Sequence, residues 1–119
     1  MKIKEITKIV NKVYPLICAD YNSTALVDFH YNIYERLSGE KGMTGEVCAH
    51  GEYDWNTDKI YIYTSRMKCE EDIIRSLIHE CVHSTQLESI FNELYKVGET
   101  YDTHPYEIQA REAEENWKD

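Results

Sequence analysis

The chain has 119 residues, 42% of them hydrophobic and 29% charged, a composition typical of one folded domain over residues 1–119 and not of a disordered chain. Its formal net charge of −9 argues against binding to nucleic-acid phosphates or to an anionic membrane surface, since both need clustered lysine and arginine. The charged residues of Met1–Lys8 exclude the apolar core of a signal peptide, and no segment has the length of a membrane span. We therefore expect a cytoplasmic protein.

The four cysteines are widely spaced and form no Cys-x-x-Cys pair; they are Cys18, Cys48, Cys69 and Cys81. This spacing is typical neither of a zinc knuckle nor of an exported disulfide scaffold. Because Cys81 lies among apolar residues of a predicted helix, we expect it to be a buried, reduced thiol.

The first half of the chain predicts one helix and three strands. Apolar residues at three- and four-residue spacings indicate an amphipathic helix over residues 2–14, which Pro15 ends or kinks. Alternating apolar and polar side chains then predict a half-buried strand over residues 25–36, a second alternating segment from Val47 to Tyr53, and a third strand from Lys59 to Thr64. Because the connections are short, we expect the strands to pair in sequence as an antiparallel meander.

The second half of the chain predicts helices. The acidic residues 70–72 suit the first turn of a helix, and we expect helical character to continue until Gly98 ends it. Polar side chains form one stripe along this otherwise apolar helix; they are Asp72, Ser76, His79 and His83. A last helix is predicted from Pro105 to Trp117, with Thr103 or His104 as its cap. This order predicts an α+β domain in which a three-stranded antiparallel sheet lies between an N-terminal helix and two later helices.

The chemistry of the chain is concentrated in the stretch His79-Glu80-Cys81-Val82-His83. Two histidines four residues apart project from the same face of a helix, so that both imidazoles can reach one metal ion. Glu80 points to a neighbouring position, close enough to contact a metal-bound water without being a ligand. A zinc-dependent hydrolase needs this arrangement.

Two histidines alone make an incomplete site, because catalytic zinc takes three protein ligands and keeps a fourth position for water. Glu107, near the start of the last helix, is our prediction for the third ligand. The small Ala110 lies one turn further on and would let the two helices approach closely. His104 and Glu114 are the alternative third ligands.

His79-Glu80-x-x-His83 followed by Tyr106-Glu107-x-x-Ala110 resembles the zincin metallopeptidases. More narrowly it resembles the gluzincins, in which a glutamate on a downstream helix is the third zinc ligand. The resemblance covers about residues 60–117, and the compact size is similar to that of minimal bacterial and phage members. Metzincins fit less well, because Gln86 and Ser89 stand where they have glycine and a further histidine.

This resemblance implies a metallopeptidase that binds one Zn²⁺ and hydrolyses a peptide or protein substrate. Zinc would lower the pKa of a bound water and polarise the substrate carbonyl, and Glu80 would act as general base. The family also implies a tyrosine or histidine that holds the oxyanion; the open candidates are His104, Tyr106, Tyr101 and His30. In zincins the strand before the active-site helix borders the cleft, so we expect Lys59–Thr64 to pair with an extended peptide.

Three alternatives remain open at this point. The chain could be a zinc-containing, non-catalytic binding protein on a zincin scaffold, or an amidase that acts on a small molecule or on a protein modification. In the plainest alternative, the two histidines belong to a polar helix face that only contacts solvent. The sequence predicts no particular oligomeric state.

Overall fold

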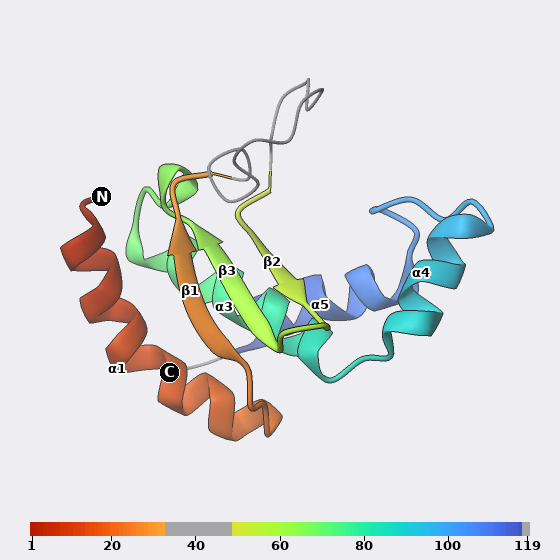
Figure 1. The fold of residues 1–119 in the computed structure, drawn as a ribbon, viewed down its shortest axis with the longest axis horizontal. Helices are drawn as coiled ribbons and strands as arrows, with labels where there is room; N and C mark the ends of the chain where they lie inside the picture. The colour runs from red at the N-terminus through yellow and green to blue at the C-terminus, as the bar shows by residue number, and fades with distance from the viewer. Residues whose placement is uncertain (33–48, 118–119) are drawn as a thin grey trace.

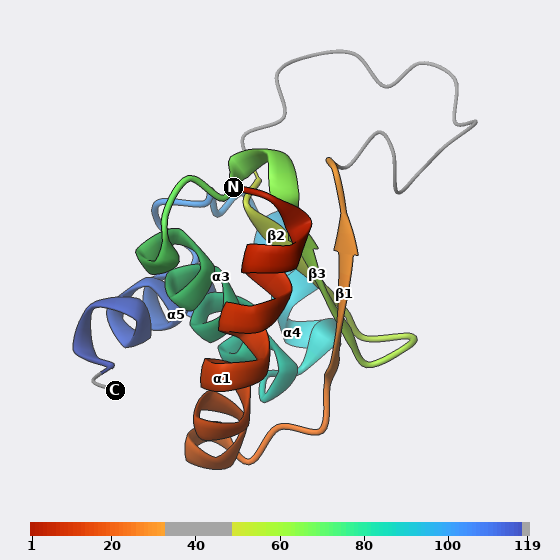
Figure 2. The ribbon, with the colours of Figure 1, turned by 90° about the vertical axis from the view of Figure 1, so that its left-hand side faces the viewer.

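The structure has two layers, a three-stranded sheet and helices that cover one of its faces (Figures 1 and 2). It is a computed structural model that describes residues 1–32 and 49–117. Its elements in chain order are α1 (Ile3–Tyr21), β1 (Leu26–His30), β2 (Gly51–Asp54), β3 (Lys59–Tyr63), the 3₁₀ turn η1 (Thr64–Arg66), α3 (Glu70–Ser84), α4 (Glu88–Lys96) and α5 (Pro105–Asn116). The predicted α+β class is confirmed.

The strand order in the sheet is β1-β3-β2, with β3 parallel to β1 and antiparallel to β2. The predicted antiparallel meander is therefore wrong: the sheet is mixed, and β1 and β2 lie on opposite edges. The reason is burial. Ile60, Ile62 and Tyr63 of β3 are fully buried, and the most apolar strand takes the central position, where both of its edges are paired.

Two of the predicted strands begin or end where the structure gives no description. The first strand ends at His30, and residues 33–36 of the prediction lie outside the described residues. Val47 at the start of the second predicted strand also lies outside them, and β2 itself begins at Gly51. The third strand is confirmed to within one residue.

Helix α1 continues through Pro15 to Tyr21, so the predicted end near residue 14 is wrong. A proline removes one backbone hydrogen bond from a helix. The buried face formed by Ile6, Val10 and Val13 continues beyond the proline with Ile17, and its packing compensates for the loss. The helix ends at Asn22, whose left-handed backbone (φ 53°, ψ 42°) is tolerated by asparagine better than by most residues.

The predicted single helix from residue 70 to Gly98 is two helices, α3 and α4, because α3 ends at Ser84. Two hydroxyl side chains at this point bond to carbonyls of the last turn: Ser84 Oγ donates to Cys81 O, and Thr85 Oγ1 donates to Val82 O at 2.7 Å. Such bonds compete with continuation of the helix. The predicted start of the last helix at Pro105 is confirmed, with His104 as its cap.

Helix α3 is held in place by apolar contacts on three sides. Its buried residues pack against α1, the sheet and α5; the core of these contacts is Ile6, Ile17, Ile60, Ile62, Ile73, Leu77, Ile78, Cys81 and Ala110. Each fully buried aliphatic side chain contributes about 1.5–3 kcal/mol. Cys81 is a buried free thiol, as predicted. Among the described residues, no helix is long and apolar enough to cross a membrane.

The turn between β2 and β3 is joined to the end of α1 by one carboxylate. Asp58 accepts hydrogen bonds from Thr24 Oγ1 and from Tyr53 Oη, both at 2.6 Å. These two bonds lower the pKa of Asp58. A carboxyl whose pKa is lower in the folded protein stabilises the fold above its unfolded pKa, and this contribution is lost as the pH falls.

We expect Asp58→Asn to lower the free energy of unfolding by about 1 kcal/mol at pH 7, because two hydrogen bonds to an ionised carboxylate are replaced by weaker bonds to a neutral amide. Asparagine tolerates the left-handed backbone of this position (φ 53°), so the variant removes only the acceptor. The difference from wild type should shrink as the pH is lowered from 7 to 3. Urea unfolding at several pH values measures it, with the exposed Asp102→Asn as control.

Candidate metal centre

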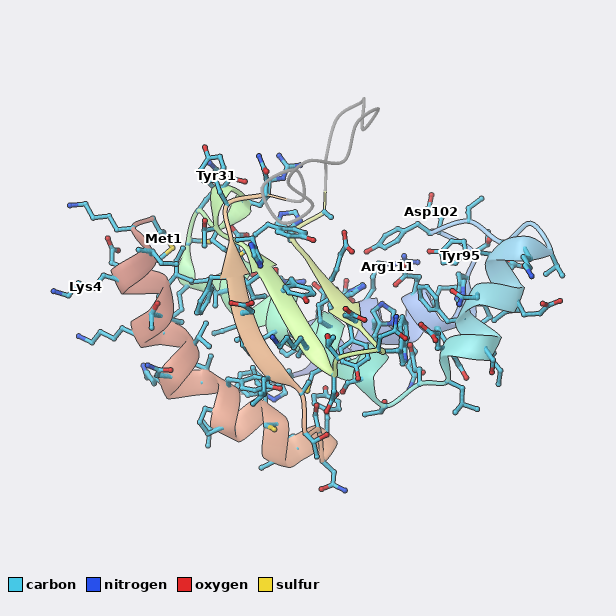
Figure 3. All side chains as sticks on the ribbon, viewed as in Figure 1. Met1, Lys4, Tyr31, Tyr95, Asp102 and Arg111 are labelled. Carbon is cyan, nitrogen blue, oxygen red and sulfur yellow. The ribbon has the colours of Figure 1, made fainter. Side chains whose placement is uncertain are left out.

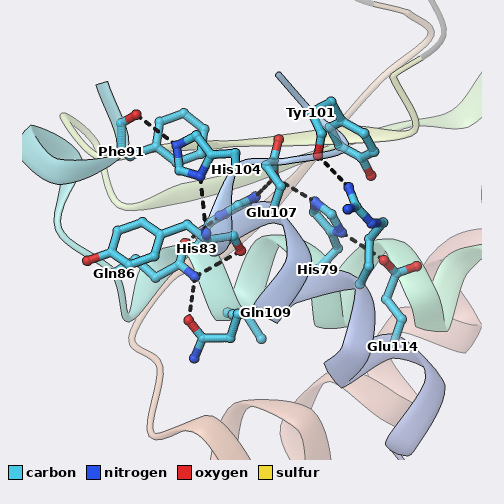
Figure 4. Close-up of polar contacts among 12 residues, drawn as sticks. His79, His83, Gln86, Phe91, Tyr101, His104, Glu107, Gln109 and Glu114 are labelled. Atoms are coloured by element: carbon cyan, nitrogen blue, oxygen red, sulfur yellow. Dashed lines mark hydrogen bonds and ion pairs between the residues drawn. The ribbon is translucent and has the colours of Figure 1, made fainter. Parts of the chain in front are cut away.

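Two residues of α3 and one of α5 bring their donor atoms together (Figure 4). His79, His83 and Glu107 are buried, and one ligand atom of each lies within 4.8 Å of the other two. Glu107 Oε1 lies 3.2 Å from His79 Nε2 and 2.6 Å from His83 Nε2. This buried group could bind a metal ion.

Local structure explains why these three side chains meet. His79 and His83 are one helical turn apart on α3 and therefore share a face. Glu107 lies in the first turn of α5, where the positive end of the helix dipole favours an ionised carboxylate. Ala110 is fully buried against the core, and its small side chain lets α5 approach α3 closely.

Each of the three ligand side chains makes one further hydrogen bond, through the atom that faces away from the group. These bonds run from His79 Nδ1 to Glu114 Oε2 at 2.7 Å, from His83 Nδ1 to Gln86 Oε1 at 2.7 Å, and from Tyr95 Oη to Glu107 Oε2 at 2.8 Å. Tyr95 extends from α4 toward α5 to make its bond (Figure 3). Partners of this kind fix the tautomer and the orientation of metal ligands.

The donor set fits zinc in type and nearly in spacing. Two imidazole nitrogens and one carboxylate oxygen are typical zinc ligands, and ligand distances of 2.0–2.1 Å in a tetrahedron place donor atoms about 3.3 Å apart. The separation of 3.2 Å between His79 Nε2 and Glu107 Oε1 matches this spacing. The separation of 2.6 Å from His83 Nε2 is shorter, so a small outward rotation of His83 or Glu107 would admit the ion.

The charges of the group depend on one another. Burial alone would lower the pKa of His79, but hydrogen bonds to Glu107 and Glu114 outweigh burial and raise this pKa to about 10. Burial alone would raise the pKa of Glu107, but hydrogen bonds from His79 and His83 hold it well below its ordinary value. Glu107 is therefore an ionised carboxylate and His79 holds a proton at neutral pH, so a metal ion would displace that proton when it binds.

Glu80 lies beside the group without belonging to it. Its side chain is 7% exposed and lines the cavity that the ligands face. Within residues 1–32 and 49–117, its carboxylate makes no hydrogen bond. Burial raises the pKa of Glu80 above its ordinary value, although His79 and His83 act in the opposite direction. Carboxyl groups that line a cavity and have a pKa shifted by burial often occur at functional sites.

The triad and Glu80 lie on the wall of a cavity of about 900 Å³. The other lining residues come from β2 and the segments that flank it, from the first half of α3, from α4, from the link before α5 and from α5 itself; they are Ala49, His50, Gly51, Glu52, Tyr53, Trp55, Asp72, Arg75, Ser76, Phe91, Tyr101 and Glu114. A cavity of this size can hold a short peptide segment or a small molecule.

The strand beside the cavity is β2, and the prediction that Lys59–Thr64 borders it for strand pairing is wrong. β3 lies between β1 and β2, so both of its edges are already paired. At Gly51 a Cβ atom would lie 2.6 Å from the main-chain oxygen of Tyr61 in β3, which is too close, and 3.6 Å from Glu80 Cγ, which is an ordinary contact. Glycine is therefore required here by the pairing of β2 with β3.

Of the four candidates for holding an oxyanion, the structure places Tyr101 at the cavity. Its ring is stacked on His79 with 6.2 Å between centroids. Arg111 holds it there, with its guanidinium 4.6 Å from the Tyr101 ring centre and a 2.6 Å hydrogen bond to Tyr101 O.

The other three candidates do not line the cavity. His104 is fully buried, and its Nε2 donates to Phe91 O while its Nδ1 accepts from Tyr106 N. It thus joins α4 to α5. Tyr106 uses its carbonyl to accept from Gln86. His30 lies at the end of β1, where its ring contacts Tyr61.

Sequence reasoning missed two residues of the site, Gln86 and Tyr95. Gln86 was noted only as a departure from another family's pattern, and Tyr95 was assigned to a continuing helix. Glu114 was an alternative ligand, and the structure places it on the outer nitrogen of His79. The periodicity of the predicted helices contains no signal for these contacts, since each one depends on how α3, α4 and α5 pack.

Comparison of the chain with protein-family models, with curated proteins and with solved structures finds no match. What the site can do therefore follows from its own chemistry. It presents two nitrogen donors and one oxygen donor for a cation, and beside them a carboxylate that lines the same open cavity.

We expect Glu107→Ala to weaken zinc affinity by more than about 100-fold, because it removes the only anionic donor of the group. Competition with a chromophoric chelator measures the dissociation constant. Glu112→Ala, an exposed change on the same helix, should leave it unchanged. If Glu107→Ala binds zinc as tightly as wild type, then Glu107 is not the third ligand and Glu114 is the next candidate.

Proposed function

We propose that the chain is a zinc-dependent metallopeptidase of the zincin type, similar to the gluzincins, which hydrolyses a peptide or amide bond. The observation that carries this proposal is the position of Glu80. A buried carboxylate lies beside three converging metal donors and faces the same cavity as they do. A purely structural zinc site has closed coordination and no use for such a group.

Zinc held by His79, His83 and Glu107 would supply a Lewis acid that polarises a carbonyl and lowers the pKa of water. Glu80 accepts a proton from the attacking water and passes it to the leaving amine. Its raised pKa suits this task, because an acid–base group works best when its pKa lies near the working pH.

Tyr101 is the residue best placed to stabilise the oxyanion. Burial raises the pKa of its hydroxyl, so the phenol keeps its proton at neutral pH and can donate a hydrogen bond. The Arg111 guanidinium lies 4.6 Å from the centre of the same ring and holds it in place. A donor that is held in place before the reaction costs no reorganisation when charge develops.

The substrate is proposed to lie along β2. This strand is at one edge of the sheet, and among the described residues no strand pairs with its outer side. The strand lines the cavity with Gly51, Glu52 and Tyr53. An extended peptide could add to such an edge by main-chain hydrogen bonds, which would carry its scissile bond past Glu80.

The main rival is a binding protein that keeps the zinc site and sequesters a partner without hydrolysis. An amidase that acts on a small molecule or on a protein modification would use the same residues. Both rivals bind zinc as the proposed peptidase does. Of the two rivals, only the binding protein has no need for the carboxylate of Glu80.

We expect Glu80→Gln to retain about one zinc per chain and to lose hydrolysis by at least about 100-fold, because it removes the general base and leaves the ligands intact. Elemental analysis gives the zinc content, and a mixture of quenched fluorescent peptides reports cleavage. Glu112→Gln is the matched control. Wild-type protein that binds zinc and cleaves none of the peptides would speak for one of the rivals.

A further inference from the structure

Gln86 connects the metal centre to two helices. It follows the end of α3 by two residues and is 8% exposed. Its side-chain oxygen lies 2.7 Å from His83 Nδ1, and its amide nitrogen donates to Tyr106 O at 3.1 Å and to Gln109 Oε1 at 2.9 Å. Both ends of the Gln86 amide are thus hydrogen-bonded within the protein (Figure 4).

The orientation of this amide is fixed by one of its partners. The main-chain carbonyl of Tyr106 can only accept a hydrogen bond. The group of Gln86 that faces it must therefore be the amide nitrogen, and the oxygen must face His83. Turning the amide over would set two oxygens against each other at Tyr106.

A carbonyl oxygen at His83 Nδ1 requires a hydrogen on that nitrogen. Nε2, the atom that faces Glu107 and His79, is then the nitrogen of His83 whose hydrogen a metal ion would displace. The main-chain carbonyl of Tyr106 in α5 thus decides that His83 carries a hydrogen on Nδ1, although it does not contact His83. It does so by fixing the orientation of the Gln86 amide.

We propose that Gln86 is a positioning residue that presents Nε2 of His83 to the metal and makes metal affinity depend on how α5 packs against α3. The proposal rests on the metal centre described above. His79 differs, since its Nδ1 bonds to a carboxylate. Glu114 can accept a hydrogen bond through either oxygen and needs no third group to orient it.

The test compares zinc dissociation constants of wild type and three variants by chelator competition. Gln86→Met keeps the length of the side chain and removes both hydrogen-bonding groups. Gln86→Glu restores an acceptor for His83 and removes the donor to Tyr106. Gln109→Met changes an exposed partner of Gln86 without altering the bond to His83.

We expect Gln86→Met to weaken zinc binding 10- to 100-fold. Gln86→Glu should recover at least half of that loss on a logarithmic scale. Gln109→Met should change the zinc dissociation constant less than threefold. In the zinc-loaded wild type, the Nδ1 proton of His83 should give a resolved, slowly exchanging NMR signal. Gln86→Met should lose this signal while thermal unfolding still shows a folded protein.

Equal affinities of wild type and Gln86→Met would overturn the positioning role and leave the metal centre standing. So would a Gln86→Glu variant that binds zinc no better than Gln86→Met, because the side chain would then act through packing alone. Wild type that binds no zinc would overturn the metal centre, and the role of Gln86 with it.

Discussion

The structure depends most on the close packing of α5 against α3, which places a buried carboxylate between two imidazoles. Removing an ion from water costs several kcal/mol unless its new partners compensate. Glu107 has such partners in His79, His83 and Tyr95. The apolar contact at Ala110 lets α5 pack closely against α3. The same helix packing therefore stabilises both the core and the site.

Features that depend on neighbouring residues could be predicted from the sequence. The capped start of α5 at Pro105, the buried strand Lys59–Tyr63 and the start of α3 at residue 70 all follow from local patterns. The strand order could not be predicted, because alternation shows which side of a strand is buried and says nothing about its neighbours. Pro15 was misjudged because the cost of one backbone hydrogen bond was weighed without the apolar face that continues beyond it.

The residues of the candidate site also fall into those that local sequence patterns predict and those that depend on tertiary packing. The pair His79 and His83 is visible in sequence since helical spacing alone puts both on one face. Glu107 was chosen because a third donor was required, and the structure brings it to them. The roles of Gln86 and Tyr95 could not be predicted, because hydrogen bonds between side chains of different segments produce no periodic pattern in the sequence. Their contribution is orientation, and orientation is decided by tertiary packing.

The break between α3 and α4 is the feature of the fold that the site needs most. Had α3 continued as one helix, Tyr95 would stand twelve residues beyond His83, about 18 Å away along the axis at 1.5 Å per residue. The turn after Ser84 instead brings α4 back, so that Tyr95 donates to Glu107 and the Phe91 ring contacts His83 at 5.2 Å between centroids. Gln86 lies inside that same turn. The residues that end the helix and those that orient the ligands are therefore adjacent in the chain, and a change that extended α3 would remove two of the three outer hydrogen bonds at once.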